Sequence, residues 1–82
     1  MSHMTDPDGA QARVLLTALR EQVREMTPRL ARVERKAVCG SHTARSRAMR
    51  QQAAELRRDI GNAQFLIAQI HRRFPETTRA DA

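Results

Sequence analysis

The chain of 82 residues is long enough for one small domain, and its abundant Ala, Arg, Leu, Glu and Gln favour helices. Only two residues are aromatic, Phe65 and Phe74, which excludes a β-sandwich or β-barrel built from aromatic and β-branched strands. The net charge of +6 indicates an acidic or anionic partner.

Residues 1–9 are predicted to be a disordered N-terminal segment. The opening Met1-Ser2-His3-Met4 is typical of a cloning remnant, with Met4 as the native start. The stretch Asp6-Pro7-Asp8-Gly9 is a turn or helix-cap signal. Because the chain shows neither a secretory segment nor an apolar run that could cross a membrane, we expect a cytoplasmic location.

A first helix is predicted over residues 10–38, because apolar residues recur there at alternating spacings of four and three, as in a heptad seam. The seam residues are Ala12, Leu16, Leu19, Val23, Met26, Leu30, Val33 and Ala37. Pro28 falls outside the seam, which passes it without a change of phase. Two readings remain open: a kinked but continuous helix, or a break at which Thr27 caps a new helix.

Residues 39–43 are predicted to form a loop, since Gly40 suits a helix end and Ser41 or Thr43 can cap the next helix. A second helix is predicted over residues 44–74, again with four–three spacing. Its seam residues are Met49, Ala53, Leu56, Ile60, Ala63, Ile67, Ile70 and Phe74. Residues 75–82 are predicted to be a flexible tail.

The two seams fit one antiparallel hairpin, because a loop this short makes the helices antiparallel neighbours. The position numbers of facing seam residues, such as Val33 with Met49 and Leu16 with Ile67, add to nearly the same total throughout. The predicted fold is therefore an all-α, antiparallel two-helix coiled-coil hairpin. A lone hairpin buries little apolar area, so we expect it to dimerise into a four-helix bundle.

The predicted dimer or partner interface is an apolar patch beside the seams, near the ends of the helices that lie away from the loop. It comprises Val14, Leu15, Ala18, Phe65 and Leu66.

Positive charge is concentrated around the loop, in residues 29–50, which we call the tip. Seven basic residues and one acidic residue, Glu34, leave this segment with +6, the net charge of the whole chain. The predicted binding residues are Arg29, Arg32, Arg35, Lys36, Arg45, Arg47 and Arg50. Lys36 and Arg45 should face each other across the seam and repel, so the tip is predicted to meet an acidic protein surface.

Binding of a nucleic-acid phosphate backbone is the alternative for the tip, because arginine side chains suit phosphates. The tip has no aromatic residue on which bases could stack, and no helix-turn-helix or zinc-finger motif is present.

Cys39 and His42 are weak candidates for a metal site, because one chain supplies only two ligands and a tetrahedral zinc site needs four. No cofactor is expected. The stretch Leu19-Arg20-Glu21-Gln22-Val23 looks like the first helix of helical chorismate mutases, but the chain supplies no further helix with catalytic residues. No catalytic triad or phosphate-binding loop is present either, so we predict a protein that is not an enzyme.

One polar stripe of the second helix combines Arg47, Gln51, Glu55 and Asp59 at four-residue spacing. It is loosely similar to the Arg, Gln and acidic positions of helical-hairpin anti-sigma factors that bind cyclic di-GMP. That family has an acidic residue and a serine before the arginine, where this chain has Gly40 and Ala44. The resemblance implies an anionic nucleotide as a further alternative ligand.

Overall fold

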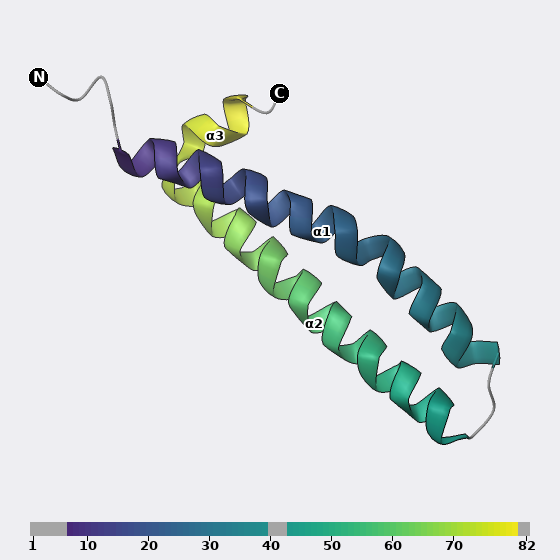
Figure 1. Cartoon of the computed structure of the whole chain (residues 1–82). Coiled ribbons are helices and arrows are strands. Elements are labelled where there is room, and N and C mark those ends of the chain that lie inside the picture. Colours follow the sequence, from purple (N-terminus) through teal and green to yellow (C-terminus); the bar gives the residue numbers. More distant parts are fainter. Residues whose placement is uncertain (1–6, 40–42, 81–82) are drawn as a thin grey trace, which may run out of the picture.

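The computed structural model describes residues 7–39 and 43–80, and these form three helices. They are α1 (Pro7–Cys39), α2 (Ala44–Arg73) and the short α3 (Pro75–Ala80). Helices α1 and α2 lie side by side and antiparallel along most of their length, and the described residues include no strand (Figure 1). The predicted all-α helical hairpin is confirmed.

Helix α1 runs without interruption through Pro28, so the break at Thr27 is wrong and the continuous helix is confirmed. The Thr27 hydroxyl donates to the Val23 carbonyl at 2.7 Å, a bond within the helix and not a cap of a new one. The helix also begins at Pro7, within the segment predicted to be disordered. Proline suits a first helical position because the N–H that it lacks would have no partner in the helix.

Helix α2 begins at one of the two predicted caps. The Thr43 hydroxyl accepts a hydrogen bond from the Ser46 backbone N–H at 3.0 Å. The helix ends at Phe74, whose backbone N–H still donates to the Ile70 carbonyl at 2.7 Å. Phe74 leaves helical geometry because the ring of the following residue, Pro75, disfavours it. Gly40, Ser41 and His42 lie outside the described residues.

The core consists of seam residues only, which confirms the predicted pairing of the two helices. The buried apolar residues are Ala12, Leu16, Leu19, Val33, Ala37, Ala53, Leu56, Ala63 and Ile70. All of them except Ala37 form two clusters, one near the loop around Leu56 and one at the other end around Leu16. We call this other end the open end; it contains the start of α1, the end of α2, and α3.

Helix α3 occupies residues for which we predicted a flexible tail. It is attached through Thr77, which is only 1% exposed and whose hydroxyl donates to the Phe74 carbonyl at 2.7 Å. The same hydroxyl oxygen lies 2.9 Å from Nδ1 of His71. Because the hydroxyl proton is already used, this oxygen accepts from His71, which places the imidazole proton on Nδ1.

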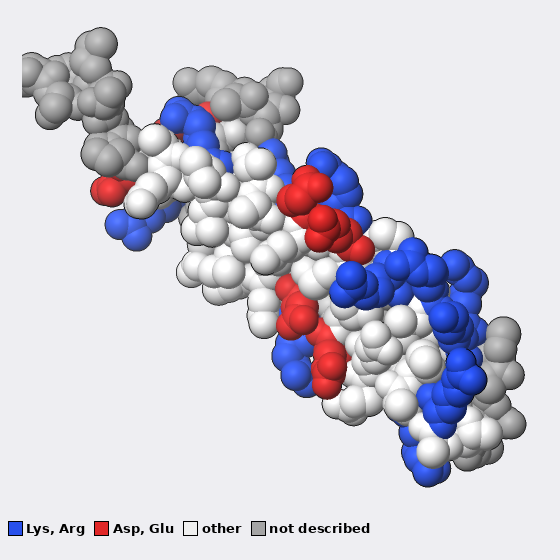
Figure 2. Space-filling model, in the orientation of Figure 1, with Lys and Arg blue, Asp and Glu red and all other residues white. Residues whose placement is uncertain are grey.

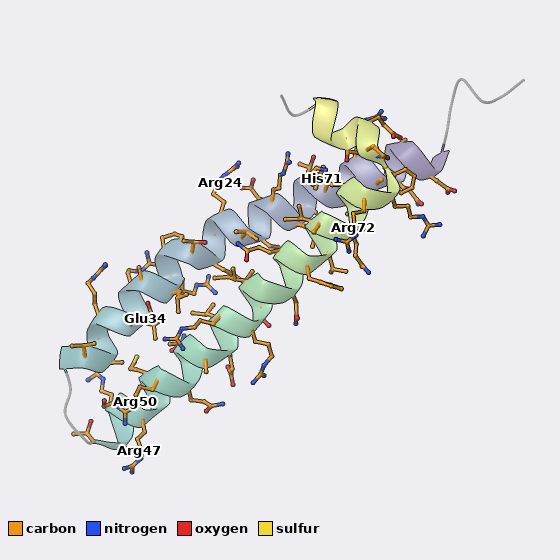
Figure 3. The ribbon with its side chains drawn as sticks, turned by 180° about the vertical axis from the view of Figure 1, so that it is seen from behind. Arg24, Glu34, Arg47, Arg50, His71 and Arg72 are labelled. Atoms are coloured by element: carbon orange, nitrogen blue, oxygen red, sulfur yellow. The ribbon has the colours of Figure 1, made fainter. Side chains whose placement is uncertain are left out.

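His71 Nε2 then faces α1 as an acceptor, and the Arg20 guanidinium nitrogen Nη2 lies 3.3 Å away. Arg20, His71 and Thr77 thus connect all three helices. Figure 3 shows His71 at the open end of the hairpin. The sequence offered no periodic signal for this attachment, because a six-residue helix spans fewer than two turns.

The molecule is an elongated rod of 63 × 19 × 16 Å. Its radius of gyration is 17.6 Å, whereas a compact domain of this length is expected to have about 12 Å. The rod is a single layer of two long helices, so each seam is covered along its length by one neighbouring helix only. In the described part of the chain, no helix has the length and apolar character needed to span a membrane.

Candidate interaction surfaces

The tip carries the predicted basic residues on its surface, and all seven are exposed. Figure 2 shows Lys and Arg side chains crowded over the loop end of the hairpin, with acidic residues gathered nearer its middle. Among the described residues, none of the seven forms an ion pair with a carboxylate. The structure therefore brings them together as a positively charged surface without internal neutralisation.

Glu34, the one acidic residue of the tip, is already engaged. Its carboxylate accepts hydrogen bonds from Nε and Nη2 of Arg57 on α2, the former at 3.1 Å. Arg57 lies outside the tip, so the carboxylate of Glu34 pairs with none of the seven basic residues of the tip. Both side chains remain substantially exposed, and the pair contributes little to stability.

The first turn of α2 has an electrostatic arrangement that works against the helix. It contains Arg45 and Arg47 and no acidic residue. The N-terminal end of a helix has a partial positive charge, so cations there cost about 0.3–1 kcal/mol each at low salt. Figure 3 shows Arg47 extending away from the hairpin at this end.

Ser46 closes the tip from inside and was missed in the sequence analysis. It is 2% exposed, and its hydroxyl donates across the hairpin to the Ala37 carbonyl at 3.2 Å. That carbonyl lies in the last turn of α1, where carbonyls have no partner within the helix. The spacing held a signal for this contact, because Ser46 continues the seam three residues before Met49.

Arg50 differs from the other tip residues because it is tied to this closure. Its Nη1 donates to the Ser46 hydroxyl oxygen at 2.8 Å, so part of its hydrogen-bonding capacity is used within the chain. Arg50 therefore supports the tip as well as charging it.

Two consecutive grooves follow one face of the hairpin, between α1 and α2. The open-end groove has a volume of about 650 Å³ and the middle groove about 360 Å³. Leu66 lines both grooves, and Leu15 lines the first from the opposite helix. We call the two grooves together the furrow. Figure 2 shows an uncharged surface over both helices in the half of the hairpin away from the loop.

The five predicted interface residues are all exposed, but the furrow takes in only two of them. Leu15 and Leu66 are 51% and 43% exposed and line the open-end groove together. Val14 and Phe65 are 71% and 59% exposed and line neither groove. Each precedes its leucine by one residue, which places it at the heptad position farthest from the seam. Ala18 is exposed and also lines neither groove.

The structure does not test the two weak metal candidates. His42 and the side chain of Cys39 lie beyond what the structure describes. Among the residues that it does describe, no group of three or more His, Cys, Asp or Glu side chains is placed to hold a metal ion.

The polar stripe of α2 is exposed along its whole length. Within it, the Gln51 amide nitrogen lies 3.5 Å from a carboxylate oxygen of Glu55, a long contact between neighbouring turns.

Comparison of the chain with protein-family models, with curated proteins and with solved structures finds no match.

Proposed function

We propose that this protein is a small cytoplasmic, non-enzymatic interaction module that self-assembles through its open end and binds an acidic protein surface through its tip. One observation carries the proposal: the tip has seven exposed basic residues, none of them paired with a carboxylate in the described chain. An acidic surface would supply the missing counter-charges.

The positions of Arg45 and Arg47 support this function because both arginines are unfavourable for the stability of α2. Acidic residues in the first turn of α2 would stabilise that helix, and the chain has arginines there instead. Departures from local stability rules of this kind are expected at functional sites.

Self-assembly at the open end is supported by the incomplete covering of the hairpin. The furrow leaves Leu15 and Leu66 about half exposed, next to the core cluster around Leu16. A second hairpin laid on this face would give the four-helix arrangement that buries such a surface.

A protein partner is favoured over nucleic acid by the position of the aromatic residues. Phe65 and Phe74 are the only two in the chain, and both belong to the end of α2 away from the loop. A tip without aromatic side chains has no stacking platform for unpaired bases.

The test is binding of a fluorescently labelled polyglutamate peptide, with duplex DNA, duplex RNA and cyclic di-GMP measured alongside. We expect the polyglutamate to bind, and the double variant R45E/R47E to weaken its binding at least tenfold. The same variant should unfold at an equal or higher temperature, because it places carboxylates at the start of α2.

The matched control is R13E/R58E, which changes the net charge equally at exposed positions outside the tip and the furrow. It should retain most of the polyglutamate affinity. Equal losses in both variants would show that only net charge matters, and tighter binding of DNA, RNA or cyclic di-GMP than of polyglutamate would overturn the protein partner.

A further inference from the structure

We infer that two copies of this chain pack antiparallel, furrow against furrow, so that Arg73 of each copy pairs with Asp59 of the partner subunit. The inference rests on the proposed self-assembly and adds to it an orientation, a register and an ion pair.

The register follows from the position of Leu66 within the furrow. Leu66 lines both grooves and so marks their junction. Arg73 lines the open-end groove and Asp59 lines the middle groove, each seven residues from Leu66. Seven residues are nearly two helical turns, so both side chains share the face of Leu66 and lie about 10 Å to either side of it.

A twofold axis that crosses the furrow at Leu66, perpendicular to α2, would exchange these two positions. It sets Arg73 opposite Asp59 of the partner subunit, and the same pair forms again on the other side of the axis. Helix α1 obeys the same symmetry around Leu15, with Asp8 and Gln22 each seven residues away. The two open-end leucines would then meet their own copies at the centre.

Both members of the inferred pair are available for it. Arg73 and Asp59 are exposed, and neither forms an ion pair in the described part of the chain. The Arg73 guanidinium carbon lies 5.9 Å from the centroid of the Phe74 ring, and Phe74 itself lines the open-end groove. This contact holds the positive charge at the edge of the furrow.

The charge distribution selects the antiparallel orientation over the parallel one. A parallel pair of hairpins would bring the two tips side by side, with seven basic residues from each copy at close range. The antiparallel pair sends the tips in opposite directions. Cys39 at the end of α1 is 24 residues from Leu15, so the two copies of Cys39 would be about 70 Å apart.

This arrangement makes the assembly bivalent. Two basic tips would project from opposite ends of a central four-helix segment, so that one dimer could bridge two acidic surfaces or bind one extended surface twice.

The orientation is tested with the chain's single cysteine. Sedimentation first establishes whether the native protein dimerises, and a spin label on Cys39 then reports the distance between copies. We expect a dimer with a label separation of about 70 Å. A dimer with a separation under 30 Å overturns the inference and leaves self-assembly standing, whereas a monomer at every concentration overturns both.

The ion pair is tested by a charge exchange. D59R and R73E should each weaken dimerisation about tenfold, because each turns two attractive contacts per dimer into repulsive ones. The double variant R73E/D59R should restore most of the loss. The matched control R58E/D59R has the native net charge and the same composition as R73E/D59R but leaves Arg73 opposite an arginine, so it should stay weak. Equal dimerisation of the two double variants would overturn the register.

Discussion

The two ends of the hairpin share one seam but differ in how their charges relate to the helices. At the open end, Asp8 lies in the first turn of α1, and Arg72 and Arg73 lie in the last turn of α2. Each of these charges complements the dipole of its helix. At the tip, α2 starts with Arg45 and Arg47 and no acidic residue. Fold stability therefore accounts for the charges of the open end but not for those that begin α2.

Each end is also closed by one buried hydroxyl, and the two closures differ in what they hold. Ser46 joins the last turn of α1 to the first turn of α2, between the two long helices. Thr77 holds the short α3 against the end of α2. The contact of Ser46 thus holds the two long helices together, whereas the contact of Thr77 attaches only the short α3.

The largest effect is expected from substitutions at the open end, which should prevent dimerisation. The double variant L15E/L66E should be monomeric at concentrations where the native protein dimerises, because it would set four carboxylates at the centre of the interface. Its helical content should be retained, since both leucines are exposed in the single hairpin. Sedimentation and circular dichroism measure the two properties.

Two controls sharpen that result. R45E/R47E should dimerise like the native protein, because Arg45 and Arg47 begin α2 at the loop end and line neither groove of the furrow. V14E/F65E should weaken dimerisation much less than L15E/L66E, because neither residue lines the furrow. If R45E/R47E dissociates the assembly instead, the roles of the two ends are assigned wrongly.

An intermediate effect is expected at the tip from Ser46→Ala. The variant removes the hydroxyl that satisfies the Ala37 carbonyl, and should lower the free energy of unfolding by about 1 kcal/mol. Denaturation in urea measures the change. Thr27→Ala is the control, because its hydroxyl is exposed and bonds within α1. An equal effect of both substitutions would remove the special role of Ser46.

The smallest effect on global stability is expected from Thr77→Val at the open end. This variant keeps the side-chain shape but loses the hydrogen bonds to His71 and Phe74. Amide hydrogens of α3 should exchange faster, while those of α1 and α2 stay protected. Loss of protection throughout the hairpin would show that α3 stabilises the whole molecule.

The sequence predicted the long-range contacts of the hairpin because heptad spacing repeats over many turns. The seam around Leu16 and Leu56 and its register were readable in this way, whereas the cap at Thr43 was one of two candidates offered by residue type. Contacts that occur once, such as that of Thr77 with His71, leave no repeat to detect. The ion pair between Glu34 and Arg57 has the register of Arg20 with His71, displaced by fourteen residues along each helix. The register of the hairpin allowed this ion pair but did not predict it, because side chains with several rotatable bonds can reach more than one partner.

The candidate surfaces were predicted less completely than the fold. Composition located the charge of the tip, since the count of basic residues needs no geometry. The apolar patch required the structure, because adjacent residues such as Leu15 and Val14 point about 100° apart around a helix. Only the packed helices show that Leu15 and Leu66 line one groove and that Leu66 continues into the next.

By itself, the amino-acid order determined the helices, their antiparallel pairing and the uneven distribution of charge, since periodicity and composition are local or repeating properties. The packed molecule alone decided which side chains share the furrow, how Ser46 and Thr77 are satisfied, and which cations lack a counter-charge. These properties depend on distances between residues far apart in the chain, and such distances are set only when the helices pack.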